Sequence, residues 1–358
     1  MSRPDARPGR GAPENRTPTR FNLPVREADG DWLDARDEID EGLPPLRTTV
    51  TVETPRTIIT HNASPDIGFD RSINAYRGCE HGCIYCFARP THAYHDLSPG
   101  LDFETKLFAK PDAPKLLRAE LAKPGYSPRP IAMGTNTDPY QPIEAKWRIT
   151  RSIIEVLKET KHPFTITTKS DRVVRDLDLI APLAAEGLVS VAVSVTSLTP
   201  EISRTLEPRA PSGRKRLAAV KALAAAGVPV SVAIAPVVPA VTDYELEQIV
   251  EAAAEAGARS TFFLPVRLPH EVAPLFRAWL DEHFPERAGK VMAIIQSMRG
   301  GKDNDPNFFT RLQGFGPWAE LLRVRFEAAV RKHGMNRERV KLRTDLFRPP
   351  EGAQLRLL

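Results

Sequence analysis

The sequence predicts an α/β protein: a partial (β/α)6 barrel of the TIM type, between a disordered N-terminal tail and a mainly helical C-terminal extension. Short β-rich runs alternate with amphipathic helical stretches over residues 71–266, and repeated strand–helix–strand units form parallel sheets. Strands such as VSVAVSV are almost continuously apolar, which indicates a sheet buried on both faces or closed into a barrel. The cysteines follow the first strand, where α/β barrels build active sites. This favours a barrel over the alternative, an open sheet.

The composition is that of a soluble protein with one large α/β unit. The 358 residues are 41% hydrophobic and 27% charged, which is ordinary usage, whereas 34 prolines are an excess that we expect in linkers and loops. No run of about 18 apolar residues occurs, and the first residues lack the apolar core of a secretory signal. We therefore expect a cytoplasmic protein. A net charge of +5 permits contact with nucleic acid but does not require it.

Two segments precede the barrel. Residues 1–46 are rich in Pro, Arg, Gly, Asp and Glu and have few large apolar residues, so they are expected to form a disordered tail. Residues 47–70 contain the β-branched, alternating stretch TTVTVETPRTIIT, with Pro55 near its middle. We expect a short edge hairpin there.

The barrel itself is expected over residues 71–266. Its predicted strands are INAYR (73–77), PIAMGT (130–135), FTITTK (164–169), LVSVAVSVT (188–196), VPVSVAIAPVV (228–238) and STFFLPV (260–266). Its predicted helices are KWRITRSIIEVLKET, VVRDLDLIAPLAAEG, RKRLAAVKALAAAG and YELEQIVEAAAEAG. Three of these helices end at a glycine that is followed by the next strand, as helix C-terminal signals require.

After residue 266 the alternation stops, and residues 267–358 are predicted to be mainly helical. Three helical patterns, PHEVAPLFRAWLDEHF, RAGKVMAIIQSM and PWAELLRVRFEAAVRKHG, flank the polar loop GGKDNDPN. The C-terminal part also carries a dense set of cations, which could track a phosphate backbone. A solvated helical face explains these cations equally well. They are Arg323, Arg325, Arg331, Lys332, Arg337, Arg339, Lys341 and Arg343.

The stretch RGCEHGCIYCFARP, residues 77–90, holds all three cysteines of the chain: Cys79, Cys83 and Cys86. In a reducing compartment such a cluster favours metal binding over a disulfide. A cubane of four irons takes one thiolate per iron, so three cysteines leave one iron open, and an open position is the mark of a catalytic metal site. Inert buried cysteines are one alternative. A zinc site that adds a histidine is the other, with His81, His92 or His95 as the candidate ligand.

This stretch resembles the cluster loop of the radical S-adenosylmethionine (SAM) superfamily, which has the spacing C-x3-C-x2-C and an aromatic residue before the last cysteine, here Tyr85. The resemblance covers roughly residues 70–266. It implies that Cys79, Cys83 and Cys86 ligate a [4Fe-4S] cluster whose open iron binds SAM. It also implies that Tyr85 lies near the adenine, with simple packing as the alternative. Reductive cleavage of SAM then gives a 5′-deoxyadenosyl radical that abstracts hydrogen from a substrate.

The ends of the later strands supply the predicted SAM contacts. Thr135 and Asn136 lie in MGTNTDPYQPIE, where many superfamily members have a Gly-Gly-Glu-like segment for the SAM amino group. Lys169 ends the third strand and could meet the SAM carboxylate, and Ser194 is a lone hydroxyl in an apolar strand that needs a partner. Arg209, after Glu207 in LEPR, resembles an arginine that grips the carboxylate. Surface ion pairs for both cations and a backbone hydrogen bond for Ser194 are the alternatives.

The motifs TNTDPYQPIE, TTKSD, SVTSL and LEPR look most similar to the spore photoproduct lyase-like branch of the superfamily. The resemblance implies a lyase-type or other hydrogen-abstraction enzyme, a flavodoxin- or ferredoxin-type electron donor and a DNA lesion as a possible substrate. Lyases of this type return hydrogen with an additional cysteine, and this chain has no fourth cysteine. The tyrosines Tyr76, Tyr94 and Tyr140 are candidates for a relay, although buried tyrosines more often pack. The alternative function is a nucleic-acid-associated protein with a structural or redox-sensing cluster.

The last residues, AQLRLL, resemble the short peptides that dock bacterial replication and repair proteins onto the sliding clamp. The anchors of such a peptide are Gln354, Leu355, Leu357 and Leu358. Deletion of residues 353–358 is therefore expected to abolish binding to the sliding clamp.

Overall fold

A computed structural model describes residues 9–18 and 46–350. Most of the predicted tail, residues 1–8 and 19–45, lies outside the described residues, as does the predicted clamp-binding peptide at 353–358. Residues 9–18 are described, and Gly11, Ala12 and Pro13 are buried. No pattern in the sequence indicated this burial.

The predicted parallel sheet is confirmed. Seven strands lie in the order β10-β9-β8-β7-β6-β3-β2, and β10 does not pair with β2, so the barrel is partial. All neighbours are parallel except the edge strand β2, which runs antiparallel to β3. The strands are β2 Thr60–His61, β3 Arg71–Ile73, β6 Ile131–Met133, β7 Phe164–Thr168, β8 Val189–Ser194, β9 Val230–Val237 and β10 Ser260–Pro265.

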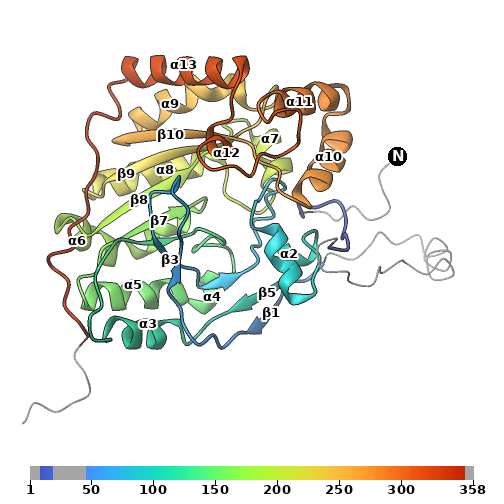
Figure 1. The fold of residues 1–358 in the computed structure, drawn as a ribbon. Coiled ribbons are helices and arrows are strands. Elements are labelled where there is room, and N and C mark those ends of the chain that lie inside the picture. The colour runs from blue at the N-terminus through green and yellow to red at the C-terminus, as the bar shows by residue number, and fades with distance from the viewer. Residues whose placement is uncertain (1–8, 19–45, 351–358) are drawn as a thin grey trace, which may run out of the picture.

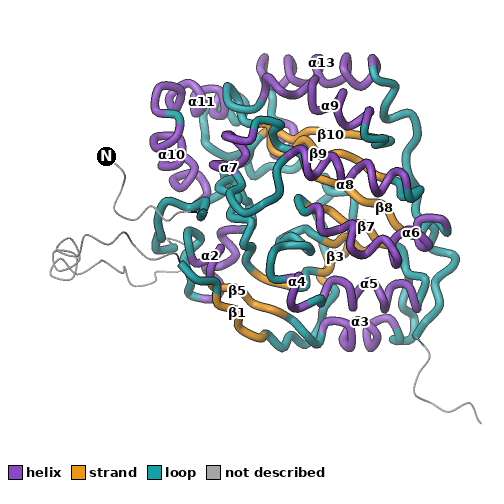
Figure 2. The backbone as a smooth tube through the Cα atoms, turned by 180° about the vertical axis from the view of Figure 1, so that it is seen from behind, coloured by secondary structure: helices purple, strands orange, loops and turns teal. Residues whose placement is uncertain are grey.

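Helices cover the outer face of this sheet, as Figures 1 and 2 show from opposite sides. Each crossover brings amphipathic residues such as Ile153 and Leu223 onto the apolar side chains of the strands, in one hydrophobic core. The elements concerned are α3 Ala113–Leu121, α4 Glu144–Trp147, α5 Ile149–Glu159, η3 Asp171–Asp176, α6 Leu177–Ala185, α8 Gly213–Ala225 and α9 Leu246–Glu255. Two shorter elements complete the barrel segment: α7 Pro200–Leu206, which packs in a second cluster with Cys83, and η4 Asp243–Glu245.

The two faces of the sheet differ in side-chain size. In β8, Val189, Val191 and Val193 are fully buried against the helices, whereas Ser190 and Ala192 on the other face are only partly buried. Strand β7 repeats the pattern, with large apolar residues outside and threonines inside. TIM barrels usually fill their interior with bulky branched side chains. The strands thus place large apolar residues against the helices and smaller ones on the concave face, in a partial barrel rather than an open sheet.

A second, three-stranded sheet supports the start of the barrel, in the order β1-β5-β4. Its strands are β1 Thr49–Val52, β4 Tyr76–Arg77 and β5 Lys106–Ala109, and η2 Arg89–His95 and α2 Asp102–Thr105 precede β5. The expected lead-in hairpin does not form: β1 pairs with β5, whereas β2 pairs with β3. The segment between β1 and β2 contains Pro55, which cannot donate to a strand ladder.

The C-terminal extension is helical where patterns predicted it. Its helices are α10 Val272–His283, α11 Pro285–Ser297, α12 Thr310–Gln313 and α13 Pro317–Lys332. Helix α13 packs on α9 and β10, with Phe326 against Phe263. The chain then returns along the sheet, where Arg343 N donates to the Gly187 carbonyl and Arg348 N to that of Thr160. Among the described residues, no helix is long and apolar enough to cross a membrane.

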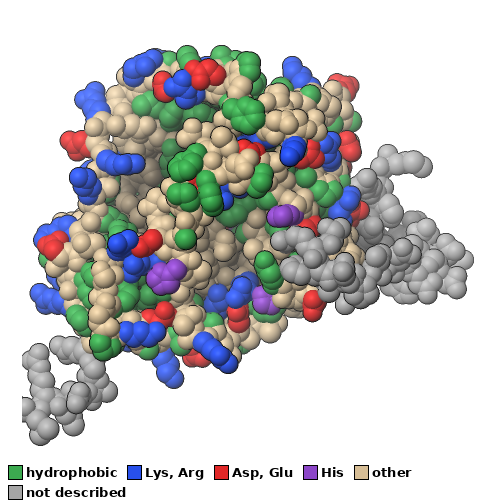
Figure 3. Space-filling model, in the orientation of Figure 1, with side chains coloured by type: hydrophobic (Ala, Val, Ile, Leu, Met, Phe, Trp, Pro, Cys, Tyr) green, Lys and Arg blue, Asp and Glu red, His purple; other side chains and the backbone are tan. Residues whose placement is uncertain are grey.

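The C-terminal cations lie in different parts of the structure. Arg323 is paired with Glu320 and Glu327, and Arg325 with Glu247. Arg337 and Arg339 line a cavity of about 610 Å³ with the first residues of β9 and β10, which is the end of the barrel opposite to the cysteines. Figure 3 shows Lys and Arg scattered among acidic side chains on the face in view. Arg323 and Arg325 are therefore already paired, and Arg337 and Arg339 lie away from the cysteines.

Candidate active site

The cysteine loop, residues 78–86, leaves β4 at the rim of the barrel. Gly78 and Gly82 take positive φ angles of 71° and 68°, which glycine adopts without the steric cost of a Cβ. A Cβ on Gly78 would lie 2.8 Å from the Phe103 carbonyl oxygen. Cys79 N donates to that same oxygen at 3.0 Å, and Cys86 N to the Cys83 carbonyl at 3.2 Å. The two glycines thus turn the loop tightly and bring its cysteines together.

The segment after β6 braces one side of this loop. The Gln141 side chain accepts from Glu80 N at 3.0 Å and donates to the Gly78 carbonyl at 3.1 Å. Thr137 Oγ1 donates to the same carbonyl at 2.8 Å. Gln141 is completely buried, so its amide is committed to the loop. In this chain the TNTDPYQ segment therefore fixes the backbone that carries Cys79.

Asp138, in the same segment, connects the cysteine loop to β7. Its carboxylate accepts from Thr168 Oγ1 and Lys169 N, each at 2.7 Å, and lies 3.4 Å from His81 Nδ1. Burial opposes ionisation, but His81 and these donors outweigh it and lower the pKa of Asp138 to about 2. Asp138 is therefore an ionised anchor between the loop and the strand that ends at Lys169.

The three cysteines are free, and Cys83 interacts electrostatically with both Cys79 and Cys86. Burial and the carboxylate of Asp138 raise the pKa of Cys79, while backbone N–H groups of Asp138 and His81 favour its thiolate. Burial and the Glu207 carboxylate raise the pKa of Cys83 to about 12, and the Lys169 ammonium acts in the opposite direction. Metal binding requires thiolates. The metal must therefore displace the protons of these thiols.

A buried polar network lies beside Cys83, at the carboxyl end of β8. Glu207 accepts hydrogen bonds from the Tyr85 hydroxyl and from Thr196 Oγ1, the latter at 2.8 Å, and forms an ion pair with Arg216. Arg216 also donates to the Ser194 carbonyl at 3.1 Å. Burial opposes ionisation of Glu207, but Arg216 and the Lys169 ammonium outweigh it and lower its pKa to about 2. The network holds the Tyr85 ring in place.

Lys169 extends from the end of β7 over this network. Its ammonium lies 5.7 Å from the centroid of the Tyr85 ring, and it acts electrostatically on both Cys83 and Glu207. Within the part of the chain that the structure describes, this ammonium has no salt bridge with a carboxylate. A cation that forms no salt bridge and lies between the cysteine loop and an aromatic ring suits an anionic ligand group.

The other predicted SAM contacts are arranged differently. Asn74, at the end of β3, donates to Thr135 Oγ1 at 3.0 Å and accepts from Asn136 N at 2.9 Å. Both residues thus lie on the rim beside β3. Ser194 is buried at the end of β8. Arg209 forms an ion pair with Glu80 at 3.2 Å, which is the alternative that the sequence left open, and so it is tied to the outer side of the cysteine loop.

The residues fit a cluster better than a single zinc ion. Among the described residues, no three or more His, Cys, Asp and Glu side chains are placed to hold one metal ion. His92 Nε2 donates to the Lys106 carbonyl at 2.8 Å, and His81 pairs with Asp138. Burial lowers the pKa of His92 to about 4. A cubane requires each thiolate at a different corner rather than at one point, as three cysteines along a turning loop can provide.

The candidate relay tyrosines are mostly committed to packing. Tyr76 and Tyr140 are completely buried, and the hydroxyl of Tyr76 donates to Glu144. Burial and the Asp176 carboxylate raise the pKa of Tyr140. Tyr94 is exposed on η2.

Some residues of the site were not singled out from the sequence. Thr196 lies at the end of the same predicted apolar strand as Ser194. Its hydroxyl therefore needs a hydrogen-bond partner for the same reason. Arg216 lies in RKRL at the start of α8, where a solvated helix face would be the ordinary interpretation. Only the fold shows that its side chain turns inward to Glu207.

Comparison with known proteins gives a family and a set of relatives. The family model of the radical SAM superfamily matches residues 73–253, half of the chain. An uncharacterized protein of Mycobacterium tuberculosis is 41% identical over 230 residues, which are 64% of this chain and 68% of the relative. An uncharacterized protein of Methanocaldococcus jannaschii is 27% identical over 214 residues, 60% of this chain and 76% of the relative.

Solved structures share the fold. A spore photoproduct lyase complexed with dinucleoside spore photoproduct superposes with a TM-score of 0.55 and 17% identity, covering 80% of this chain and 79% of the lyase. A cysteine-to-alanine mutant of a spore photoproduct lyase, also with the dinucleoside, gives 0.55 and 15% identity over 88% of this chain and 86% of its own. At this identity the likeness shows the fold alone, and it confirms the predicted partial barrel.

Proposed function

The chain belongs to the radical SAM superfamily, whose members use a [4Fe-4S] cluster and SAM, and from this premise we propose the residues that bind them here. Cys79, Cys83 and Cys86 ligate the cluster, and SAM binds at its open iron with its carboxylate toward Lys169. The observation that carries this proposal is the Lys169 ammonium, which lies over Tyr85, near Cys83 and Glu207, and forms no salt bridge in the described structure.

A [4Fe-4S] cluster held by Cys79, Cys83 and Cys86 would supply the electron for reductive cleavage of SAM into methionine and a 5′-deoxyadenosyl radical. The protein's own groups position the reactants for this step. Tyr85, fixed through Glu207 and Thr196, forms a wall beside the cysteine loop, where the adenine binds. Thr135, Asn136 and Ser194 lie at the rim formed by β6 and β8 and are kept as candidate contacts. The small side chains of the concave face leave room for a substrate next to the radical.

Lys169 is expected to contribute directly to the affinity for SAM. Lys169→Met keeps the length of the side chain and removes its charge, and a hydrogen bond to a charged group is worth about 1.5–3 kcal/mol. We expect SAM to bind roughly 10- to 100-fold more weakly, with an unchanged iron content. Anaerobic titration of the reconstituted protein with SAM measures this.

Lys161→Met is the matched control, because Lys161 pairs with Glu186 at 2.7 Å and lies at the amino end of β7. Its SAM affinity should equal that of the wild type. Equal affinity in Lys169→Met would remove Lys169 from the site.

For the substrate, we propose a nucleic acid, on the support of the lyase-like sequence motifs and of the fold shared with a photoproduct lyase. All three cysteines of the chain lie in the cluster loop, so hydrogen return by a cysteine is not available to this protein. The reaction proposed is abstraction of a hydrogen atom from a nucleotide. The resulting substrate radical does not receive its hydrogen from a cysteine of this chain. A thymine-photoproduct oligonucleotide carrying deuterium is expected to transfer the label to 5′-deoxyadenosine. Unlabelled 5′-deoxyadenosine formed in its presence would reject this substrate.

Superfamily members need an electron donor, and for this chain we propose one of the flavodoxin or ferredoxin type. A nucleic-acid-associated protein whose cluster is structural or redox-sensing is the second candidate function. The observation that favours it is the tight bracing of the loop by Gln141 and Asp138, since a structural cluster needs the same support. Reductive cleavage of SAM distinguishes the two candidate functions, because only the enzyme forms 5′-deoxyadenosine.

A further inference from the structure

Residues 10–12 lie directly on helix α2, which contains Glu104. Gly11 N and Ala12 N donate to the two carboxylate oxygens of Glu104, at 2.9 and 2.8 Å. Arg10 Nη1 donates to the Glu104 carbonyl at 3.0 Å. The Ala12 side chain is 1% exposed and packs in the same hydrophobic cluster as Cys83. Three consecutive residues thus donate hydrogen bonds to Glu104, which is more than 90 residues away in the sequence.

Arg89 connects Glu104 to the cysteine loop. The two side chains form an ion pair at 2.6 Å, and both are completely buried. The Arg89 guanidinium also donates to the carbonyls of Gly82 and Cys83, at 3.0 and 2.9 Å. Both acceptors belong to the loop itself. The N-terminal residues, Glu104 and Arg89 therefore form one continuous hydrogen-bonded chain that ends at the backbone of Cys83.

A direct contact reinforces this chain. A Cβ built on Gly11 would lie 1.7 Å from the Gly82 carbonyl oxygen, so the two glycine backbones touch. Arg10 adds a second connection: its Nη2 donates to the Leu46 carbonyl at 2.6 Å and to Thr48 Oγ1 at 3.1 Å. Thr48 in turn donates to Glu80 at 2.5 Å. The loop is thus held at both Glu80 and Gly82.

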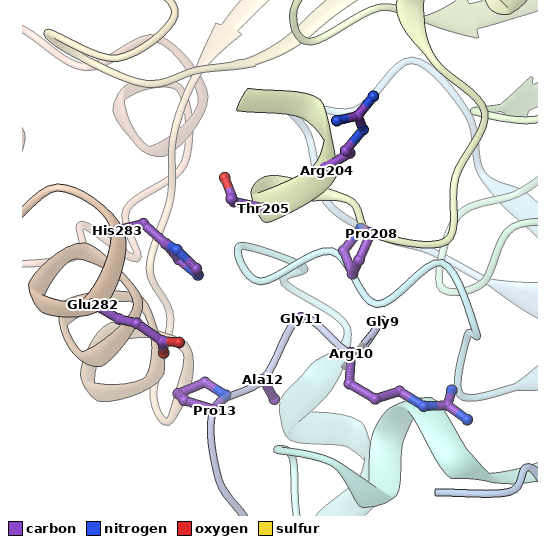
Figure 4. A pocket seen from close by; sticks show the side chains of 10 residues that line it. All are labelled: Gly9, Arg10, Gly11, Ala12, Pro13, Arg204, Thr205, Pro208, Glu282 and His283. Atoms are coloured by element: carbon purple, nitrogen blue, oxygen red, sulfur yellow. The ribbon is translucent and has the colours of Figure 1, made fainter. Parts of the chain in front are cut away.

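A cavity adjoins the other side of the same residues. A cavity of about 480 Å³ separates Gly9–Pro13 from α7 and from the end of α10. Figure 4 shows Ala12 and Pro13 on one wall, with Thr205 and His283 on the opposite side. The segment is therefore fixed from the inside by polar contacts, and space lies outside it.

We propose that Arg10–Ala12 form an N-terminal latch over the cysteine loop, with Glu104 and Arg89 as positioning residues. The closed latch holds the backbone of Gly82 and Cys83 in the conformation that binds the cluster and limits access of solvent and oxidants to it. The part about the cluster rests on the proposed function. The latch itself concerns only the loop, so it is testable in the protein without a cluster.

Gly11→Ala tests the latch with a single methyl group, because the added carbon collides with the Gly82 carbonyl oxygen. In the metal-free protein, local opening of the loop should raise the rate at which iodoacetamide alkylates Cys83 by about tenfold. Peptide mass spectrometry assigns the modified cysteine. Arg10→Ala, which removes contacts without adding a collision, should act in the same direction. Gly68→Ala is the control, since a Cβ there meets nothing within 4 Å.

In the reconstituted protein, the same two variants should lose iron in air about tenfold faster than the wild type, at an unchanged melting temperature. Alkylation rates in Gly11→Ala and Arg10→Ala within twofold of the wild type would overturn the latch. A wild-type protein that binds no iron would instead contradict the proposed function, and the alkylation result would stand independently of it.

Discussion

Cys83→Ser is expected to reduce the iron bound after anaerobic reconstitution to a small fraction of the wild-type content and to lower SAM cleavage to the level of protein-free controls. A serine hydroxyl does not replace a thiolate as a ligand to a soft iron–sulfur centre, and two remaining cysteines leave two irons without protein ligands. Iron and sulfide analysis, together with chromatography of the SAM products, measures both effects.

Phe87→Ser is the control for this variant. Phe87 lies next to Cys86 but is exposed, so its replacement should leave the iron content unchanged. A full complement of iron and sulfide in Cys83→Ser would contradict the assignment of Cys83 as a ligand, provided that circular dichroism shows a folded protein for both variants.

Glu207→Gln is expected to cause the largest loss of folding stability of any single change at the site. The amide keeps a hydrogen-bond acceptor for Thr196 but leaves the Arg216 guanidinium, which is 1% exposed, without a counter-charge. Removing one partner of a buried ion pair costs about 3–5 kcal/mol. Denaturant unfolding at pH 7 measures the change in the free energy of unfolding. Because Glu207 also fixes Tyr85, SAM affinity should fall as well.

The sign of the pH dependence follows from the lowered pKa of Glu207. The folded value of about 2 lies below the ordinary value of 4.5, so the stabilisation is fully present above pH 4.5 and is lost as the pH falls toward 2. A shift of this size corresponds to roughly 3 kcal/mol. The wild type should therefore lose its stability advantage over Glu207→Gln in that pH range.

Glu245→Gln is the matched control. Glu245 is equally buried and accepts from Leu198 N and Thr199 Oγ1, but no arginine pairs with it among the described residues. We expect a smaller loss of stability. An equal loss in both variants would show that hydrogen bonding, rather than the charge of Arg216, determines the effect.

The barrel strands were predictable because each is a short β-rich run, and three of them follow a glycine that ends the preceding helix. FTITTK and LVSVAVSVT became β7 and β8 within two residues. The three-stranded sheet was not predictable: β1 and β5 are separated by more than fifty residues, and their pairing depends on the path of the chain between them. Local patterns do not encode such a pairing.

The site also contains some residues that the sequence predicts and others that only the fold shows. The cysteine spacing and the position of Lys169 at a strand end follow from sequence order, because the carboxyl ends of parallel strands meet at one rim. The roles of Arg216, Arg89 and Glu104 do not, since each is a charged residue that ordinarily faces water. Their burial is possible only because each finds its counter-charge in a distant part of the fold.

Formation of 5′-deoxyadenosine tests most directly whether this loop binds a cluster that cleaves SAM. The reconstituted wild-type protein, reduced anaerobically with dithionite in the presence of SAM, should form 5′-deoxyadenosine and methionine in equal amounts. Formation should require Cys79, Cys83 and Cys86, and it should fall in Lys169→Met at limiting SAM. A protein that carries a full complement of cluster iron yet forms no 5′-deoxyadenosine above the protein-free background would contradict the claim and favour a structural or redox-sensing cluster.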